Sequence, residues 1–265
     1  MKVALTSLVC LAGVLILAGC GGSMGFLKPG GDDSQADALV DKSLDAIGSQ
    51  AAWSKVGSID CWAIVTSYDE AGLAALTRLK LTIYPGPRKI STVIQTSDGP
   101  VSVTADESGI IRSMFFPLKL DGEVAQRLDR ELAMILYHVL GPLNLIDGTE
   151  VPGSVSNVQV AGEDLIRLSV DGGSPGRAAY YFKGQERLLR LVTVGGDEKG
   201  SQGTAAIYDY INLPDGLSVP RRIRIVKIGQ TSIIGDQPVL VVELTDVSVH
   251  RGIKSTRMWR RVTNW

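Results

Sequence analysis

The chain has 265 residues, of which 45% are hydrophobic, and its formal net charge is −1. This length suits one large domain or two small ones, and the apolar content is sufficient for a proper core. The near-neutral charge does not supply the strongly basic face that nucleic-acid binding needs, so we expect no nucleic-acid partner.

The first twenty residues have the pattern of an export signal. Lys2 is the only charged residue before Cys20, and the run from Val3 to Leu17 consists almost entirely of Ala, Val, Leu, Ile and Gly. A short cationic region followed by such an apolar run is typical of a secretory signal. The run is shorter than the about 20 residues that a comfortable membrane span needs.

The end of this run, Leu17-Ala18-Gly19-Cys20, resembles the lipobox of bacterial lipoprotein precursors. The resemblance implies a signal peptide over residues 1–19, a diacylglyceryl group on the Cys20 thiol, and usually an acyl chain on the new amine. Two or more such chains anchor a protein stably to a membrane. The alternatives are an ordinary cleaved signal with an incidental Cys20, or a generic apolar helix. Four lipobox positions in register favour the lipoprotein.

Residues 20–34 are rich in glycine and predict a flexible tether, and residues 35–265 then form the folded domain. A helix is expected from Asp33 or Ser34 to Ile47, because apolar residues recur at helical spacing. Gly48 follows it, at a position that favours positive φ.

From Val56 the hydrophobic pattern changes from helical to alternating, which indicates β-strands. The strands expected in the first half are residues 56–67, 73–84, 89–96, 100–105 and 110–116. They are separated by short turns, which leave no room for βαβ crossovers. The first half is therefore predicted to be an antiparallel meander.

A long helix is expected over residues 121–140, ended by Gly141-Pro142. Its two faces differ strongly, so it must lie on an apolar surface. The apolar side is predicted to hold Val124, Leu128, Leu132, Ile135, Leu136 and Val139. The polar side is predicted to hold Glu123, Arg127, Arg130 and Glu131.

The second half returns to strands, and two of them, residues 187–194 in part and 239–244, are apolar on both faces. Such strands need cover on both sides. The strands expected here are residues 156–161, 164–170, 178–183, 187–194, 205–213, 221–228 and 239–250. Many short antiparallel strands with two helices predict an α+β domain built on one large curved sheet.

Cys61, His138 and His250 are candidates for chemistry. Cys10 lies in the signal peptide and Cys20 is expected to carry the lipid, so Cys61 is the only free cysteine of the mature chain. Cys61 is expected to be a small buried hydrophobe and not a reactive thiol. His138 and His250 are the only histidines, and each is expected to be structural or solvated, not catalytic. Without a cysteine cluster they do not suggest zinc, so we expect no metal and no cofactor.

The sequence Gly172-Gly173-Ser174-Pro175-Gly176 matches the G-x-S-x-G nucleophile elbow. The elbow needs the backbone N–H after the serine for its oxyanion hole, and Pro175 has none. A second match, residues 21–25, lies in the tether. Both are interpreted as glycine-rich turns, and we expect the protein not to be an enzyme.

The chain ends in a basic segment, which suggests contact with anionic headgroups through its cations and tryptophans. The alternative, a charged last strand with packed tryptophans, is slightly favoured. The residues concerned are Lys254, Arg257, Trp259, Arg260, Arg261 and Trp265.

The folded part resembles the outer-membrane lipoprotein-sorting (LolA/LolB-like) superfamily. The resemblance depends on residues 180–184, 188–190 and 208–210 and on the turn and proline of residues 213–220, with weaker matches at residues 46–59 and 84–88. It implies an unclosed, strongly curved antiparallel sheet, a half-barrel, whose hollow is plugged by helices. The hollow of that family accepts acyl chains or another hydrophobic partner.

From these patterns we expect a lipid-anchored cell-envelope protein that holds acyl chains of a lipid or lipoprotein in an apolar cavity. It would face the periplasm, and the outer membrane is slightly favoured because Gly21 is not the aspartate that retains some lipoproteins in the inner membrane. The alternative is a scaffold or stress sensor that binds a protein partner and has no ligand cavity. The residues expected to face the cavity are Leu79, Leu81, Ile83, Leu128, Leu132, Ile135 and Ile223.

Overall fold

The structure is a computed structural model that describes residues 33–111, 120, 122–146, 150–171, 178–195, 203–228, 234–235 and 238–252. The lipobox, the tether as far as residue 32, both G-x-S-x-G matches and the basic segment at the chain end lie outside these ranges.

Twelve strands form one sheet in which all neighbours are antiparallel. The first five strands and the last seven form two meanders, and the pairing of the first with the last strand joins them. The strands are β1 (Val56–Tyr68), β2 (Ala74–Tyr84), β3 (Lys89–Thr96), β4 (Gly99–Asp106), β5 (Gly109–Ile110), β6 (Val151–Val160), β7 (Glu163–Asp171), β8 (Ala178–Lys183), β9 (Leu189–Val194), β10 (Thr204–Asn212), β11 (Ser218–Lys227) and β12 (Pro238–Arg251).

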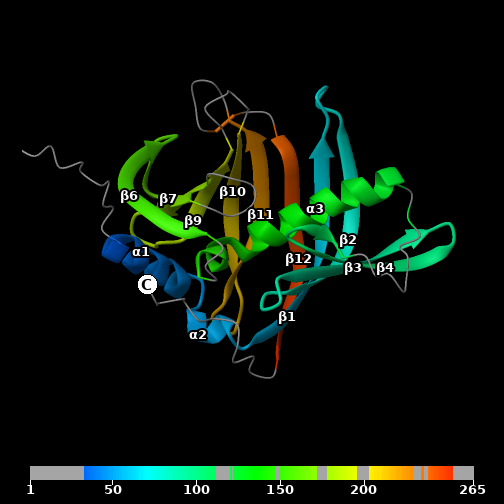
Figure 1. Ribbon diagram of the computed structural model, residues 1–265, viewed down its shortest axis with the longest axis horizontal. Helices are drawn as coiled ribbons and strands as arrows, with labels where there is room; N and C mark the ends of the chain where they lie inside the picture. The colour runs from blue at the N-terminus through cyan, green and yellow to red at the C-terminus, as the bar shows by residue number, and fades with distance from the viewer. Residues whose placement is uncertain are drawn as a thin grey trace, which may run out of the picture. The chain divides into compact units, whose positions relative to one another are not determined.

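The sheet is curved and open. Its strand order is β5-β4-β3-β2-β1-β12-β11-β10-β9-β8-β7-β6, and its two end strands, β5 and β6, are not paired with each other in the described part of the chain. Figure 1 shows the sheet bending around one long helix, α3, which lies in its hollow. The α+β half-barrel predicted from the sequence is therefore confirmed.

The helix α3 (Gly122–Leu140) spans the hollow, contacting β3, β4 and β5 toward one end of the sheet and β11 in the other half. It continues into the 3-10 helix η1 (Gly141–Leu145). Pro142, expected to stop the helix, lies in the first turn of η1, where its missing N–H is tolerated. Gly141 has a φ of 46°, which marks the break between the two helices.

The two faces of α3 differ from the prediction at two positions. Glu131, assigned to the polar side, is only 6% exposed, because it lies three residues after Leu128 and four before Ile135, on the stripe that packs against the sheet. Val124, assigned to the apolar side, is 36% exposed in the first turn of the helix. Burial raises the pKa of the Glu131 carboxyl, and the nearby cations of Arg127 and Arg130 oppose that rise.

Two shorter helices precede the sheet. The helix α1 (Asp33–Ala46) packs against β6 and η1 with its apolar stripe buried. Gly48, just after it, has a φ of 114°, as its place after the helix predicts. A four-residue helix α2 (Gln50–Trp53), capped by the Ser49 hydroxyl, was not predicted, because a single turn is too short to show a periodicity.

Strand boundaries agree with the prediction within about two residues, except in β5, β6 and β11. The strand β5 ends at Ile110, and residues 112–116 of the strand predicted over residues 110–116 lie outside the described ranges. The strand β6 begins at Val151, five residues before the predicted start. The strand β11 begins at Ser218 and includes Pro220, which lies where the β10–β11 register shifts between Asp209 and Tyr210. Proline is tolerated at such a bulge because no ladder hydrogen bond is required there.

Apolar clusters cover both faces of the second half of the sheet. In β8, Tyr180 and Phe182 belong to the main core under α3, whereas Ala179 and Tyr181 belong to a smaller cluster on the opposite face. Leu191 of β9 joins the smaller cluster as well. The prediction that residues 187–194 are in part apolar on both faces is thus confirmed. None of the described helices is long and apolar enough to cross a membrane.

Candidate functional site

The seven residues predicted to face a cavity all lie in the main core between the sheet and α3. Leu79, Leu81 and Ile83 extend from β2, and Leu128, Leu132 and Ile135 extend from α3. With Ile223 of β11 they belong to one packed cluster, and none is more than 5% exposed. The structure therefore brings the seven together as core, and a role in ligand binding stays a prediction for them.

An open pocket of about 340 Å³ lies beside this core, between α3, the turn after β4 and the ends of β9 and β10. None of the seven predicted residues lines it. The residues that do are Glu107, Arg130, Ala133, Met134, Tyr137, His138, Val194 and Thr204.

Five of the lining residues come from α3 at positions 130, 133, 134, 137 and 138, which is helical spacing over two turns. Burial increases along this stripe: Arg130 is exposed, Met134 is half-buried and His138 is buried. The helix therefore presents a cation at the mouth of the pocket and ring side chains at its inner end. Ala133 and Met134 form an apolar wall between them.

The inner end of the pocket is polar but uncharged at His138. The His138 Nδ1 atom lies 2.6 Å from the hydroxyl oxygen of Tyr208, which is on β10 in the sheet. Burial lowers the pKa of the His138 imidazole to about 3, so the ring is neutral at physiological pH. Burial also raises the pKa of the Tyr208 hydroxyl. Neither group is suited to proton transfer near neutrality.

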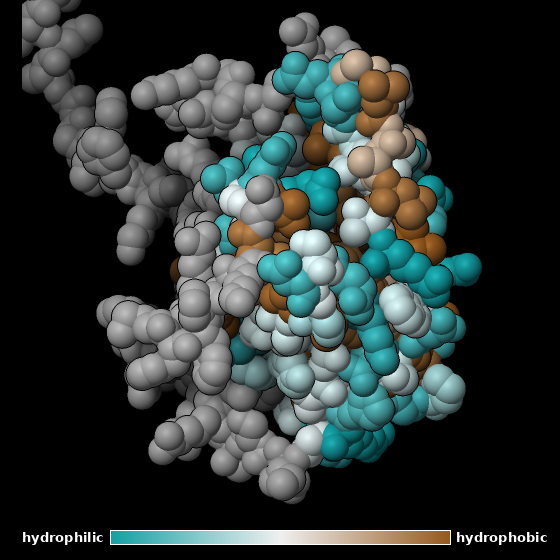
Figure 2. Space-filling view, turned by 90° about the vertical axis from the view of Figure 1, so that its right-hand side faces the viewer, coloured by the Kyte–Doolittle hydropathy of each residue, from teal (hydrophilic) through white to brown (hydrophobic). Residues whose placement is uncertain are grey.

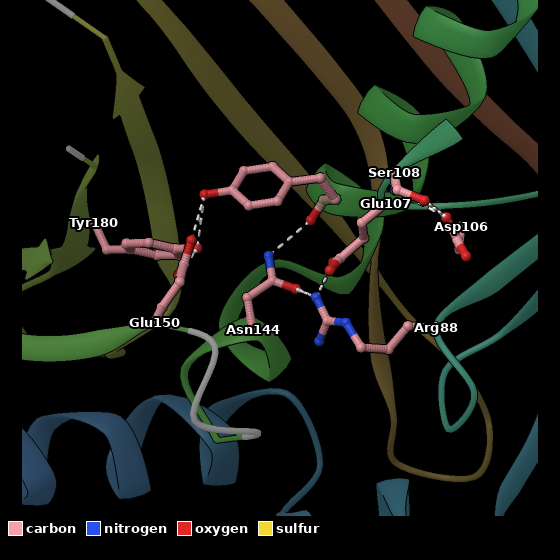
Figure 3. A network of polar contacts seen from close by, with 8 residues as sticks. Arg88, Asp106, Glu107, Ser108, Asn144, Glu150 and Tyr180 are labelled. Atoms are coloured by element: carbon pink, nitrogen blue, oxygen red, sulfur yellow. Dashed lines mark hydrogen bonds and ion pairs between the residues drawn. The ribbon is translucent and has the colours of Figure 1, made fainter. Parts of the chain in front are cut away.

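A network of polar contacts includes Glu107 and Tyr137, two of the residues that line the pocket (Figure 3). Arg88, in the β2–β3 turn, forms an ion pair with Glu107, in the β4–β5 turn. The Nη2 atom of Arg88 also donates to Asn144 Oδ1 at 2.7 Å, and Asn144 Nδ2 donates to the Tyr137 carbonyl at 2.9 Å. The network thus links two turns of the first meander to η1 and to the last turns of α3.

Through Tyr137 the network continues to Glu150 and to Tyr180 of the second meander, both of which Figure 3 labels. The Tyr137 hydroxyl donates to Glu150 Oε1 at 2.8 Å, and the Tyr180 hydroxyl donates to Glu150 Oε2 at 2.6 Å. Glu150 is only 3% exposed. Desolvation, with the neighbouring carboxylate, raises the pKa of the Tyr137 hydroxyl, and burial raises that of Tyr180, so both remain protonated donors.

The sequence did not predict this polar network or the pocket. Arg88, Glu107 and Asn144 lie in turns or in a short 3-10 helix, far apart in sequence, where the residue types fit any solvated turn. One sequence pattern does indicate part of the network. Tyr137 and His138 are polar residues near the apolar stripe of a strongly two-faced helix. A polar ring at such a position needs a buried partner.

Two other candidates for chemistry, Cys61 and His250, lie on strands of the sheet. Cys61 is buried and 3% exposed, as predicted, and burial raises the pKa of its thiol to about 12. His250 Nε2 lies 3.0 Å from Asp60 Oδ2 at a largely exposed position of β12. No cluster of three or more potential metal ligands occurs in the described ranges.

A second surface feature is the tip of the β1–β2 hairpin. Leu73 and Leu76 are each 70% exposed. In β2, only Leu81 to Tyr84 pair with β3, so the hairpin extends beyond the strands on that side. Figure 2 shows hydrophobic residues at the upper end of this face, where the hairpin lies in Figure 1.

Comparison with known proteins gives a structural likeness. No family model and no curated sequence matches the chain. The crystal structure of a LolA superfamily protein from Nitrosomonas europaea is similar with a TM-score of 0.54 and 14% identity, covering 82% of this chain and 94% of that one. The chain therefore has a LolA-like fold.

Two further crystal structures match over comparable lengths. A DUF1329 family protein from Desulfovibrio piger gives a TM-score of 0.45 at 11% identity, covering 82% of this chain and 94% of that one. An outer membrane lipoprotein-sorting protein domain from Vibrio parahaemolyticus gives a TM-score of 0.42 at 11% identity, covering 83% of this chain and 95% of that one. These TM-scores are too low to support any argument beyond the first likeness.

Proposed function

We propose that this protein is a lipid-anchored cell-envelope protein that binds the acyl chain of a lipid or lipoprotein between α3 and the curved sheet, without catalysis. The observation that carries the proposal is the open pocket beside α3, whose wall of Ala133 and Met134 faces Val194 on a LolA-like half-barrel. Open concave sites with mostly apolar walls and a few polar groups are typical of ligand binding.

The lipobox supports the anchoring part of the proposal, which places the domain on a membrane facing the periplasm. Cys20 is the residue expected to carry the lipid. Growth with labelled palmitate should label the wild-type chain, and Cys20→Ser should abolish the label. Labelling that survives this substitution would contradict the anchor.

The ligand-binding part is tested by filling the pocket. Ala133→Trp introduces a bulky side chain into the wall, and we expect it to abolish binding of a fluorescent fatty acid and to remove lipid that co-purifies in native mass spectrometry. Ala51→Trp is the matched control, because Ala51 is an exposed alanine in α2 and does not line the pocket. Absence of lipid binding by the wild-type chain, or equal binding by both variants, would overturn the proposal.

A second candidate is an envelope module that binds a protein partner. The exposed Leu73 and Leu76 at the β1–β2 hairpin favour it, because exposed apolar groups often mark interaction sites. In that case a partner captured by the wild-type chain should be lost with the double substitution Leu73→Ser and Leu76→Ser. The Ala133→Trp variant should retain that partner.

A further inference from the structure

The charges around the pocket beside α3 define the class of ligand more closely than its apolar wall does. Two charged residues line it, Arg130 and Glu107. Glu107 is paired with Arg88, so its charge is compensated within the protein. Arg130 forms no ion pair with the described residues and is exposed at the mouth. The mouth therefore offers a cation that is not held in an ion pair with the described residues.

The two ring residues at the inner end of the pocket are themselves uncharged, and the Glu150 carboxylate that accepts from Tyr137 does not line the pocket. The His138 ring is neutral because burial lowers its pKa, and the Tyr137 hydroxyl stays protonated because burial raises its pKa. Tyr137 lies two turns along α3 from Arg130, which is about 10 Å at 1.5 Å per residue. A ligand lying along this stripe would place one end at a cation and the rest against Ala133, Met134 and Val194.

We infer that the pocket takes a single long-chain amphiphile with an anionic oxyanion head, a carboxylate or a phosphate, whose head pairs with Arg130. This inference rests on the proposed function, since it names the class of ligand for the same pocket. The planar guanidinium donates two parallel hydrogen bonds to either kind of head. Thr204 also lines the pocket, and its hydroxyl adds a second polar group to the lining. A neutral acylglycerol would leave Arg130 without a charged partner.

The test uses three ligands with the same acyl chain: laurate, lauroyl lysophosphatidic acid and monolauroylglycerol. The protein is the full chain carrying Cys20→Ser, so that its own lipid does not compete. We expect the two anionic ligands to bind about tenfold more tightly than the neutral one, which corresponds to about 1.4 kcal/mol. Comparison of laurate with the lysophosphatidic acid then distinguishes a carboxylate from a phosphate head.

Arg130→Gln should remove the preference, weakening the anionic ligands about tenfold and leaving monolauroylglycerol unchanged. Arg127→Gln is the matched control, because Arg127 is another exposed arginine of α3, one turn away, that does not line the pocket. Added salt should weaken the anionic ligands in the wild-type and control proteins and have little effect in Arg130→Gln.

The outcomes separate this inference from the function on which it rests. Equal affinity of the wild-type chain for anionic and neutral ligands would overturn the inference and leave the proposed function standing. Equal effects of Arg130→Gln and Arg127→Gln would do the same, because a general surface charge would then explain the preference. Failure of all three ligands to bind would overturn both.

Discussion

His138 and Tyr208 connect α3 to the floor of the sheet, with the imidazole Nδ1 2.6 Å from the phenolic oxygen. Both side chains are buried, at 6% and 2% exposure, although they are 70 positions apart in the sequence. The contact joins α3, the longest of the described helices, to the second meander by a buried polar interaction. The stability of the folded protein should therefore depend on the protonation of His138.

Acid should destabilise the protein through His138. Burial lowers the pKa of the folded imidazole from 6.5 to about 3, so between these values the unfolded chain binds a proton that the folded chain does not. The free energy of unfolding therefore falls as the pH drops below 6.5, by at most about 1.4 kcal/mol per pH unit from this group. Urea unfolding at several pH values between 7 and 4 measures the slope.

His138→Gln is the comparison for that slope, because glutamine can keep a hydrogen bond to Tyr208 and does not titrate. Both proteins share every carboxylate, so the difference between their two stability curves isolates the histidine. We expect the difference to favour the wild type most at pH 7 and to shrink toward pH 4. Parallel curves would mean that His138 is protonated as easily in the folded as in the unfolded chain.

The hydroxyl of Tyr180 should contribute measurably to stability. It donates to Glu150 Oε2 at 2.6 Å, and Glu150 is almost fully buried. Tyr180→Phe removes one donor from a buried carboxylate, and we expect the free energy of unfolding to fall by about 1–3 kcal/mol. Tyr68→Phe is the control, because Tyr68 is half-buried at the end of β1, and we expect a change within about 0.5 kcal/mol. Urea midpoints that shift equally for the two variants would contradict the role of the contact.

The thiol of Cys61 should be inert in the folded protein. Burial and, to a lesser extent, the Asp60 carboxylate raise its pKa to about 12, so almost no reactive thiolate is present at pH 8. In a chain carrying Cys10→Ser and Cys20→Ser, a thiol reagent should modify Cys61 only after denaturant is added. Adding Leu73→Cys at the exposed hairpin supplies a positive control, which should react at once in the folded state. Rapid modification of Cys61 without denaturant would show that β1 opens locally.

The sequence predicts most of this fold because hydrophobic periodicity reports local geometry. The alternation of Leu79, Leu81 and Ile83 and the helical spacing of Leu128, Leu132 and Ile135 gave the right elements and the right buried faces. Periodicity is less informative where an element is one turn long, as in α2, or where a strand has few apolar residues, as at the start of β6.

The candidate site was harder to predict, because it depends on which residues pack and which border an open space. Leu132 and Met134 are both apolar residues of α3, yet Leu132 is fully buried and Met134 lines the pocket. Only the rotation of the helix relative to the sheet decides between them. The partners of Arg88 and Glu150 come from segments that the topology brings together, and no local pattern reports such pairs.

The close approach at Gly48 yields a last prediction about the packing of α1. Gly48 has a φ of 114°, and a Cβ there would lie 2.8 Å from both the Gly216 carbonyl oxygen and the Leu217 Cδ2 atom in the β10–β11 turn. The Ser218 N–H donates to the Ile47 carbonyl at 3.0 Å beside this contact, which holds the helix end against the turn. Gly48→Ala therefore adds a backbone clash to an unfavourable φ, and we expect it to destabilise the protein by more than about 2 kcal/mol.

Gly72→Ala separates these two effects. Gly72 also has a positive φ, of 79°, but a Cβ there would meet nothing within 4 Å, so this variant has the backbone strain without the clash. We expect it to lower the free energy of unfolding by about 1 kcal/mol, the usual magnitude for a non-glycine residue in the left-handed region. Urea unfolding of the two variants measures both values. Equal losses would mean that the β10–β11 turn moves away without cost and that α1 is not held by this contact.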